Sequence, residues 1–299
     1  MKAIYKKGEI MKRAIRRFVG SLTGPKKYIF FISLILICIV ALCLGIYAQF
    51  FYKYSDTDAL MLGINIGSQK TAEEIVVLKS NFNNLFTNSI VINSENVRVD
   101  RIEPTKDLVY TGYNLVNEDE NYYSVNAQIP ILNINNDQAK QINAEIKTLF
   151  YDQANSIMRR NEGKTIYTVS YASFVNGNVL SMVIKSTLKE EGKSEKVSVK
   201  TYNYSILEHK MISLDNLIKE KGKTNEEIQN IINEDIKKAY NNAEIIADQY
   251  GTLYQRDLSS DIYKLENAEN YFLTQDGYVY IIYAYGNNDY TNEMDIIIF

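Results

Sequence analysis

The chain is organised around residues 28–52, YIFFISLILICIVALCLGIYAQFFY. The segment 28–48 has no charged side chain, and its length matches the ~20 apolar residues that a helix needs to cross a bilayer. Aromatic residues stand at both ends of 28–52, as in the interfacial belts of a spanning helix. A secretory signal peptide has a shorter apolar core of about 7–15 residues. The sequence therefore predicts one transmembrane helix, in preference to a buried core helix.

Charge is divided unequally between the two sides of this segment. The chain has 33 basic and 36 acidic residues, of which residues 1–27 hold nine basic and one acidic. The tail thus carries +8, and the remainder, with 24 basic and 35 acidic residues, carries −11. The positive-inside rule places 1–27 in the cytoplasm and 53–299 outside it. We predict a single-pass cell-membrane protein with an extracytoplasmic domain, and we expect no nucleic-acid partner.

Cysteine and histidine usage restricts the chemistry of the exterior part. Both cysteines, Cys38 and Cys43, lie within 28–52, so residues 53–299 have neither a disulfide nor a thiolate metal site. The single histidine, His209, disfavours a multi-histidine metal site and a Ser-His-Asp triad. We therefore expect no metal and no cofactor. Abundant Tyr, Asn and Ile without any Trp suggest a low-GC bacterium of the Gram-positive type.

The cytoplasmic tail contains a candidate partner helix. Residues 10–22 alternate apolar and basic positions with helical spacing, so apolar side chains gather on one face and basic side chains on the other. Such a helix can lie on an anionic inner leaflet, dock a cytoplasmic partner, or serve only as the basic flank of the anchor. The residues that we assign to a partner surface are Met11, Ile15, Arg16, Phe18 and Val19.

Hydrophobic periodicity predicts the elements of the exterior part. A capping box at Thr71 and Glu74 begins a helix that ends near Asn88. Asn176-Gly177 is a strong hairpin signal between two long strand candidates. The other predicted helices are 137–160 and 224–250, and the predicted strands are 89–92, 97–102, 108–116, 121–132, 165–175, 178–189, 195–207, 270–274, 278–285 and 293–299.

These elements predict an α+β fold. We expect a single N-terminal transmembrane helix followed by an extracytoplasmic antiparallel sheet packed with about three helices. The predicted divisions are a basic cytoplasmic tail, the transmembrane helix, a juxtamembrane linker, a first α+β part and a C-terminal α+β domain. Their bounds are 1–27, 28–52, 53–70, 71–195 and 196–299.

Catalytic motifs are weak. Ser186 and Lys189 match the Ser-x-x-Lys pattern of penicillin-binding proteins, but they lie in a predicted strand, where positions i and i+3 point to opposite faces. The pairs of adjacent acids are typical of solvated surface. We therefore predict a protein that is not an enzyme. An envelope hydrolase built from scattered acids is the less favoured alternative.

Aromatic residues crowd the C-terminal strands. Such residues can anchor a protein partner or stack on sugar rings, or they can pack in the core as cross-strand pairs. The candidate ligand or partner surface consists of Tyr278, Tyr280, Tyr283, Tyr285 and Tyr290.

The C-terminal half resembles a known family. The motifs that carry the resemblance are YNYSILEHKMISLDNLI at 202–218, NYFLTQDGYVY at 270–280 and YAY at 283–285, together with IPILN at 129–133 upstream. They are similar to the extracytoplasmic domain shared by lysozyme-sensing anti-sigma-V factors and the non-catalytic region of some peptidoglycan deacetylases. The resemblance covers about 120–299. The cytoplasmic tail, at 27 residues, is short for gripping a sigma factor.

The resemblance implies a membrane-anchored extracytoplasmic binding or sensor protein of the cell envelope. Its partner outside would be a cell-wall component or a cationic protein such as lysozyme, which the negative exterior would attract. The alternative is an anti-sigma factor, which would hold a sigma factor inside and sense lysozyme or wall damage outside.

Overall fold

The computed structural model describes residues 62–67, 70–86, 99–250, 256–285 and 293–299. They belong to the second of two compact units, Met1–Leu60 and Met61–Phe299. The predicted spanning segment 28–52 and the predicted tail helix 10–22 lie outside these residues. Within the described part of the chain, no helix combines the length and the apolar character needed to cross a membrane.

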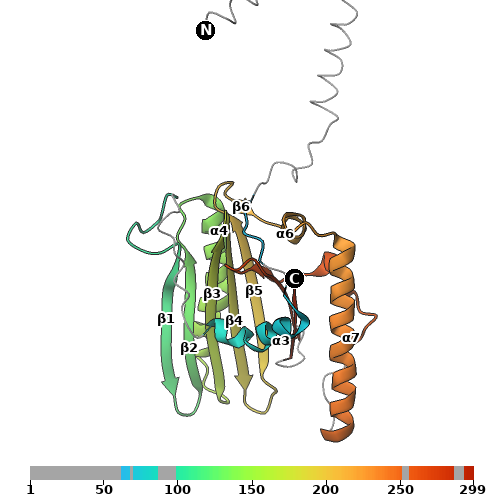
Figure 1. Cartoon of the computed structure of the whole chain (residues 1–299). Helices are drawn as coiled ribbons and strands as arrows, with labels where there is room; N and C mark the ends of the chain where they lie inside the picture. The colour runs from blue at the N-terminus through green and yellow to red at the C-terminus, as the bar shows by residue number, and fades with distance from the viewer. Residues whose placement is uncertain (1–61, 68–69, 87–98, 251–255, 286–292) are drawn as a thin grey trace, which may run out of the picture. The chain divides into compact units, whose positions relative to one another are not determined.

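Six strands form one sheet in which spatial order follows chain order (Figure 1). Asn176 pairs with Val179 at the end of the central hairpin, which confirms the predicted hairpin but places its turn at Gly177-Asn178, one residue later than predicted. All neighbours are antiparallel except β2 and β3, which run parallel, with Tyr123 opposite Thr165. The strands are β1 (Val109–Asp119), β2 (Tyr123–Leu132), β3 (Thr165–Asn176), β4 (Val179–Glu190), β5 (Lys196–Ser205) and β6 (Lys210–Met211).

The predicted fold class is therefore corrected. The described fold is α+β, but its main sheet is mixed rather than antiparallel, and none of its helices could form the predicted span. The helical run between β2 and β3 returns the chain to the end at which β2 began, so β3 must run in the same direction. The predicted succession of strand, helix and strand at 121–132, 137–160 and 165–175 already contained this signal.

Helices and a second sheet complete the fold. The second sheet has the order β7-β8-β9 and is antiparallel throughout. It consists of β7 (Tyr271–Leu273), β8 (Val279–Ala284) and β9 (Met294–Ile298). The helices are α3 (Ala72–Ser80), α4 (Asp137–Ile146), α5 (Gln153–Ile157), α6 (Leu214–Glu220) and α7 (Asn225–Tyr250), with 3₁₀ turns η1 (Phe82–Phe86), η3 (Asp261–Tyr263) and η4 (Leu265–Asn267) and a π-helical turn η2 (Lys147–Asp152).

The two faces of the main sheet are covered by different elements (Figure 1). On one face, α4, η2 and α5 bury Ile142, Ile146 and Phe150 against side chains of β2 to β5. On the other face, η1 and the second sheet pack Phe82 and Phe272 against β3, β4 and β5. The main sheet is thus the middle layer of the described unit.

Three predicted elements differ from the structure. The helix predicted from Thr71 to near Asn88 is α-helical only to Ser80 and is followed by the 3₁₀ turn η1. The predicted helix 137–160 is interrupted by the π-helical turn η2. Residues 99–102, part of the predicted strand 97–102, are not a strand, and the predicted strand 89–92 lies outside the described residues. The segment that follows residues 99–102 is held by the fully buried Asn133. Its side chain accepts from Glu103 N at 2.8 Å and donates to the carbonyls of residues 103, 106 and 107.

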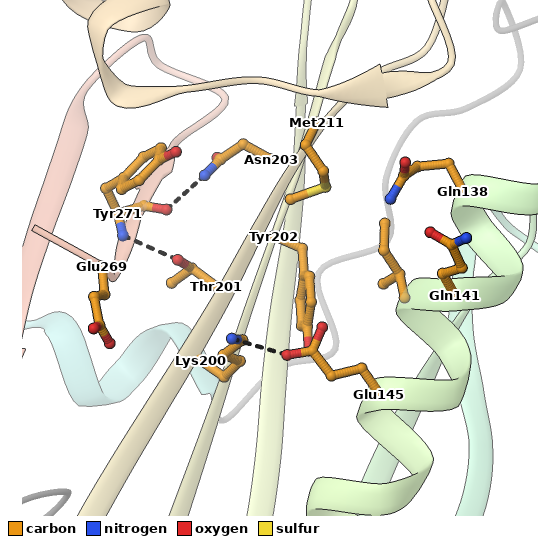
Figure 2. Close-up of a pocket in the computed structure, with 11 residues that line it drawn as sticks. Gln138, Gln141, Glu145, Lys200, Thr201, Tyr202, Asn203, Met211, Glu269 and Tyr271 are labelled. Atoms are coloured by element: carbon orange, nitrogen blue, oxygen red, sulfur yellow. Dashed lines mark hydrogen bonds and ion pairs between the residues drawn. The ribbon is translucent and has the colours of Figure 1, made fainter.

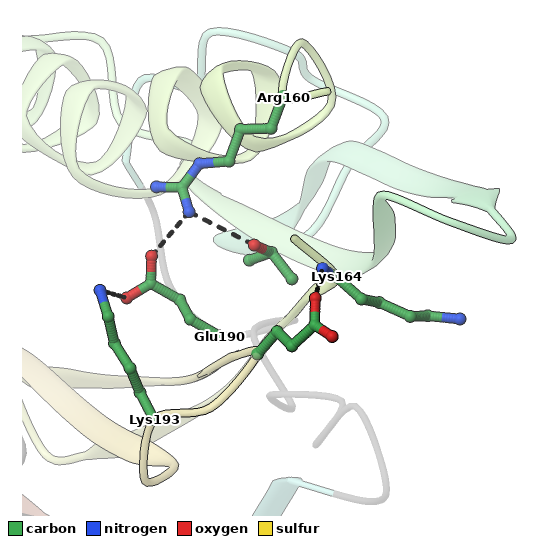
Figure 3. A network of polar contacts seen from close by, with 6 residues as sticks. Arg160, Lys164, Glu190 and Lys193 are labelled. Atoms are coloured by element: carbon green, nitrogen blue, oxygen red, sulfur yellow. Dashed lines mark hydrogen bonds and ion pairs between the residues drawn. The ribbon is translucent and has the colours of Figure 1, made fainter. Parts of the chain in front are cut away.

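A polar network secures the point where the crossover enters β3 (Figure 3). Arg160 Nη1 donates to Glu190 Oε1 at 2.7 Å, and Lys193 Nζ donates to Glu190 Oε2 at 2.9 Å. The hydrogen bonds and charges of Lys193 and Arg160 lower the pKa of Glu190. Lys164 N donates to Glu191 Oε2 at 3.0 Å. These contacts join the end of the helical run to the β4–β5 turn.

The predicted division between 71–195 and 196–299 falls inside the main sheet. Strand β5 begins at Lys196 and pairs along its length with β4. Lys196 lies opposite Leu188 at one end, and Ser205 lies opposite Val179 at the other. Residues on both sides of the predicted boundary therefore share one sheet.

Candidate ligand-binding pocket

A pocket of about 320 Å³ opens between α4 and the edge of the main sheet (Figure 2). Ligand sites in proteins typically measure about 300–1,000 Å³, so this cavity has room for one small group. Its walls come from α4, β5, β6 and the start of β7. The residues that line it are Gln138, Gln141, Ile142, Glu145, Lys200, Thr201, Tyr202, Asn203, Met211, Glu269 and Tyr271.

Helix α4 supplies the polar side of the pocket. Asn136 begins the helix, since its Oδ1 accepts from Ala139 N at 2.9 Å. The buried stripe of α4 faces the sheet, so Gln138, Gln141 and Glu145, at spacings of three and four, lie along the flank next to β5. Figure 2 shows the two carboxamides of this flank beside the cavity, and neither forms a hydrogen bond with the described residues.

Strand β5 supplies the floor. Lys200, Tyr202 and Tyr204 alternate toward α4, as the two-residue repeat of a strand requires. Lys200 Nζ forms an ion pair with Glu145 Oε1 at 2.9 Å, and both side chains are more than two-fifths exposed. This pair neutralises one of the two carboxylates in the lining.

The Tyr202 hydroxyl is the unusual group of the floor. The residue is only 3% exposed, and its hydroxyl has no partner at ordinary hydrogen-bond geometry within the described residues. Burial raises the pKa of this hydroxyl, and the negative charge of the neighbouring Glu145 and a hydrogen bond to its carboxylate raise it further. Buried polar atoms in proteins almost always have a partner, and for this hydroxyl the partner is the Glu145 carboxylate.

Tyr271 forms the wall opposite α4. Its backbone N donates to Thr201 Oγ1 at 2.9 Å, and its carbonyl accepts from Asn203 Nδ2 at 2.7 Å. Its hydroxyl donates to the carbonyl of Ile212 at 3.0 Å. Tyr271 also lines a second cavity of about 750 Å³ beside α6 and α7. Since three hydrogen bonds hold Tyr271, it is a fixed partition between the two cavities.

The pocket chemistry favours binding through hydrogen bonds. Each carboxamide offers a donor and an acceptor, and the tyrosine hydroxyl offers both. The lining includes no serine, cysteine or histidine. Among the described residues, no group of three or more His, Cys, Asp or Glu side chains is placed to hold a metal ion.

The predicted tyrosine surface is not at this pocket. Tyr278, Tyr280, Tyr283 and Tyr285 are between 1% and 8% exposed and belong to the core of the second sheet, and Tyr290 lies outside the described residues. Alternation along β8 places Tyr280 toward the main sheet and Tyr283 toward Tyr263. These four tyrosines therefore do not form an exposed surface. They project from the two faces of the second sheet, and packed side chains cover both faces.

Other residues from the sequence have no shared site. Ser186 is buried and Lys189 is exposed on β4, as the strand geometry predicts. His209 is exposed, with a left-handed φ of 57°, and its Nδ1 lies 3.3 Å from Asn136 Nδ2 and from the Tyr204 hydroxyl. The candidate tail residues Met11, Ile15, Arg16, Phe18 and Val19 lie outside the described residues.

Comparisons with known proteins give only distant structural similarity. No family model matches the chain, and no curated protein matches it. The fold is similar to a DUF3298 family protein from Pseudomonas aeruginosa PAO1, with 14% identity, 63% of this chain and 84% of that chain covered, and a TM-score of 0.36. It is also similar to a DUF3298 family member from Bacteroides fragilis NCTC 9343, with 15% identity, 59% of this chain and 80% of that chain covered, and a TM-score of 0.29. These neighbours belong to an uncharacterised domain family, and TM-scores below 0.5 carry no argument about the pocket.

Proposed function

We propose that this chain is a non-catalytic binding protein of the cell envelope, and that the pocket beside α4 is its ligand site. The observation that carries the proposal is a preformed cavity lined by polar side chains that are open to solvent. The carboxamides of Gln138 and Gln141 make no hydrogen bond with the described residues, so a ligand can take the place of their water partners.

The pocket lining supports binding rather than nucleophilic catalysis. The residues around the cavity offer no serine or cysteine nucleophile and no histidine base. Glu145 is paired with Lys200, and Thr201 already accepts a hydrogen bond from Tyr271 N. These groups are held as a fixed polar frame, which suits recognition of a ligand.

The sequence supports a location on the outer side of the cell membrane. Residues 1–27 carry +8 and the rest of the chain −11, and 28–48 contains no charge. The partner outside would then be a cell-wall component. A cationic protein such as lysozyme is the other extracellular partner that the negative charge would attract.

An anti-sigma factor is the second candidate function. It is supported by the resemblance of 120–299 to the lysozyme-sensing anti-sigma-V factors and by the amphipathic pattern of 10–22. In an anti-sigma factor the pocket would bind the extracellular signal, and residues 1–27 would hold a sigma factor. Co-purification of a sigma factor with the full-length chain, lost on Phe18→Asp, is the result that would favour it.

Sedimentation of the full-length protein with purified cell walls tests the main proposal. The protein is kept in detergent micelles, and binding is measured at about 50 mM and about 300 mM salt, since screening at the higher concentration removes non-specific charge attraction. We expect saturable binding that persists at the higher salt. The proposal fails if the protein binds neither cell walls nor lysozyme at either concentration.

A further inference from the structure

The turn between β5 and β6 exposes an apolar side chain at its tip. The turn spans residues 206–209, and Leu207 is 67% exposed, whereas the preceding Ile206 is 5% exposed. A single exposed leucine is ordinary in a protein surface. The position of Leu207 is what gives it meaning, because it lies at the end of the main sheet to which the segment 62–67 is bonded (Figure 1).

Two hydrogen bonds place the start of the segment 62–67 beside this turn. Asn178 N donates to the carbonyl of Leu62 at 2.9 Å, and Ile206 N donates to the carbonyl of Asn178 at 2.8 Å. Leu62 is 1% exposed, so the chain is fixed to the sheet at this residue. The chain therefore joins the described unit only a short distance from Leu207.

The sequence before Leu62 limits how far this end of the sheet can lie from a membrane. In the proposed location the uncharged segment 28–48 is the membrane attachment, and its aromatic border ends at Tyr52. Nine residues, 53–61, then lead to Leu62. Since an extended chain covers at most about 3.6 Å per residue, this connection reaches no more than about 36 Å. The other end of the sheet is farther away by the 12 residues of β4, or about 40 Å.

Hydrogen bonds and an ion pair define the tip around Leu207. The carbonyl of Ser205 accepts from His209 N at 2.9 Å, and its Oγ accepts from Glu208 N at 3.1 Å. Lys210 Nζ forms an ion pair with Glu208 Oε2 at 2.8 Å. These two charges neutralise each other, so the leucine projects from a turn that is held in place and locally balanced in charge.

Two further exposed apolar side chains lie at the same end of the main sheet. Ile66 is 55% exposed within the segment 62–67, which Asn176 joins to the end of β3. Ile102 is 45% exposed, and the residue after it is bonded to Asn133, just beyond the end of β2. Apolar side chains among polar groups suit the boundary between lipid headgroups and acyl chains.

We propose that the turn 206–209 contacts the outer surface of the bilayer to which the chain is attached, with Leu207 inserted at the boundary between headgroups and acyl chains. This inference rests on the proposed function, since it requires the membrane location. The lipid surface is the partner because the connection 53–61 keeps this end of the sheet within reach of the bilayer. Removal of the leucine from water makes the contact favourable.

Tryptophan fluorescence of the full-length protein tests this contact. The chain contains no tryptophan, so a single introduced tryptophan reports its own surroundings. Leu207→Trp is incorporated as one copy per disc into nanodiscs of phosphatidylcholine and phosphatidylglycerol, with ordinary or brominated acyl chains. We expect emission at shorter wavelength than in water and a loss of about half or more of the intensity in brominated lipid, because insertion by about 5–10 Å brings the indole to the bromine atoms.

Ile166→Trp is the matched control. Ile166 is 42% exposed and lies opposite Lys189, near the other end of the main sheet. A tryptophan at position 166 should emit as in water and keep its intensity in brominated lipid. Equal quenching at positions 207 and 166 overturns the proposal, since the domain would then lie on the bilayer without a preferred end. Absence of quenching at position 207 also overturns it.

Leu207→Asp distinguishes insertion of the leucine from mere closeness imposed by the short connection. Ile102→Trp reports on the same end of the sheet and should be quenched by brominated lipid. Addition of Leu207→Asp to this variant should remove most of that quenching, because a carboxylate disfavours insertion. Unchanged quenching in the double variant would overturn the role of Leu207.

Cell-wall sedimentation separates this inference from the proposed function. Leu207 does not line the pocket beside α4, so Leu207→Asp should still bind cell walls. Persistent wall binding together with an unquenched tryptophan at position 207 refutes the membrane contact and leaves the envelope-binding function standing. A full-length protein that does not enter nanodiscs refutes the membrane location, and the contact with it.

Discussion

Asn176 and Asn65 hold each other through two reciprocal hydrogen bonds. Asn65 N donates to Asn176 Oδ1 at 2.6 Å, and Asn176 Nδ2 donates to the carbonyl of Asn65 at 3.1 Å. The same Nδ2 also lies 3.2 Å from the Thr274 carbonyl and 3.1 Å from that of Gln275. One buried carboxamide at the end of β3 thus joins the segment 62–67, the main sheet and the turn of the second sheet.

Removal of this carboxamide should destabilise the described unit strongly. Asn176→Ala leaves the amide of Asn65 and several carbonyls without a partner, and each buried unsatisfied group costs about 1–3 kcal/mol. We expect a loss of about 3 kcal/mol or more in the free energy of unfolding, measured by chemical denaturation of the full-length protein. Asn178→Ala is the control, since the Asn178 side chain forms no hydrogen bond with the described residues and its loss should change stability little. Equal effects of the two variants would contradict this role.

Gly177 should be far less replaceable than Gly192, although both have positive φ, 56° and 73°. A Cβ on Gly177 would lie 2.2 Å from the carbonyl oxygen of Gly63, whereas a Cβ on Gly192 would meet nothing within 4 Å. Gly192→Ala should lose about 1–2 kcal/mol, the cost of left-handed backbone for a residue with a Cβ. Gly177→Ala adds displacement of the segment 62–67 and should lower the thermal midpoint much further. Similar midpoints would show that this segment moves away without cost.

The ion pair between Arg256 and Asp295 should be important for stability because it is buried. Arg256 Nε and Nη2 donate to the two oxygens of Asp295 at 2.6 and 2.8 Å, and the Tyr285 hydroxyl donates to Oδ2 at 2.6 Å. The side chains are only 8% and 10% exposed. Asp295→Asn should therefore lower the free energy of unfolding by about 3 kcal/mol, since the buried guanidinium loses its nearest counter-charge and keeps the more exposed Glu293 at 3.8 Å.

An exposed ion pair provides the comparison for Asp295. Asp261 and Lys264 are 2.8 Å apart, with side chains 75% and 54% exposed. Asp261→Asn should change the free energy of unfolding by less than about 1 kcal/mol, because solvent screens the pair. A loss at Asp295 as small as that at Asp261 would mean that the core admits water to Arg256.

Buried tyrosines should make the protein sensitive to alkali. Burial raises the pKa of Tyr280 from 10.0 to about 12, and burial also raises the pKa of Tyr167 and Tyr283. Above pH 10 the unfolded chain releases these protons while the folded chain keeps them, so the unfolded state binds fewer protons. The stability that Tyr280 contributes is therefore complete below pH 10 and is lost as the pH rises toward 12.

Denaturation at successive pH values measures this effect. Above pH 10, Tyr280→Phe should make the free energy of unfolding fall less steeply with pH. The reduction in slope should be up to about 1.4 kcal/mol per pH unit, the value for one ionisable proton. Absorbance of tyrosinate should show that the folded protein ionises later than the urea-unfolded one. Identical slopes for the variant and the natural protein would exclude Tyr280 as a source of the alkaline instability.

Local patterns predicted most elements of the described unit. The capping boxes at Thr71 and Thr224, the stripe of the helical run 137–160 and the hairpin between β3 and β4 are all confirmed. Each depends on residues within a few positions of one another. The parallel pairing of β2 and β3 was missed, although the helix between the two strands indicated it.

The pocket could not be predicted in the same way. Gln141 and Glu145 stand on α4 and Tyr202 on β5, and only the packing of the helix on the sheet brings them together. Nothing in the local pattern of either element distinguishes them from ordinary flank and core residues. For the C-terminal tyrosines the sequence predicted a candidate surface that the structure does not have. Their crowding in the sequence suggested a binding surface, but packed side chains on both faces of the second sheet bury them.

Sequence by itself determined the periodicity of each helix and strand, the caps and the tight turn, because these depend on neighbours in the chain. It also determined the charge difference between residues 1–27 and the rest of the chain. Only the tertiary structure decided that Tyr280 and Tyr285 are core, that Asn176 joins three segments, and that the hydroxyl of Tyr202 is buried beside Glu145. The reason is that burial and hydrogen-bond satisfaction depend on which faces meet, and those faces come from residues far apart in the sequence.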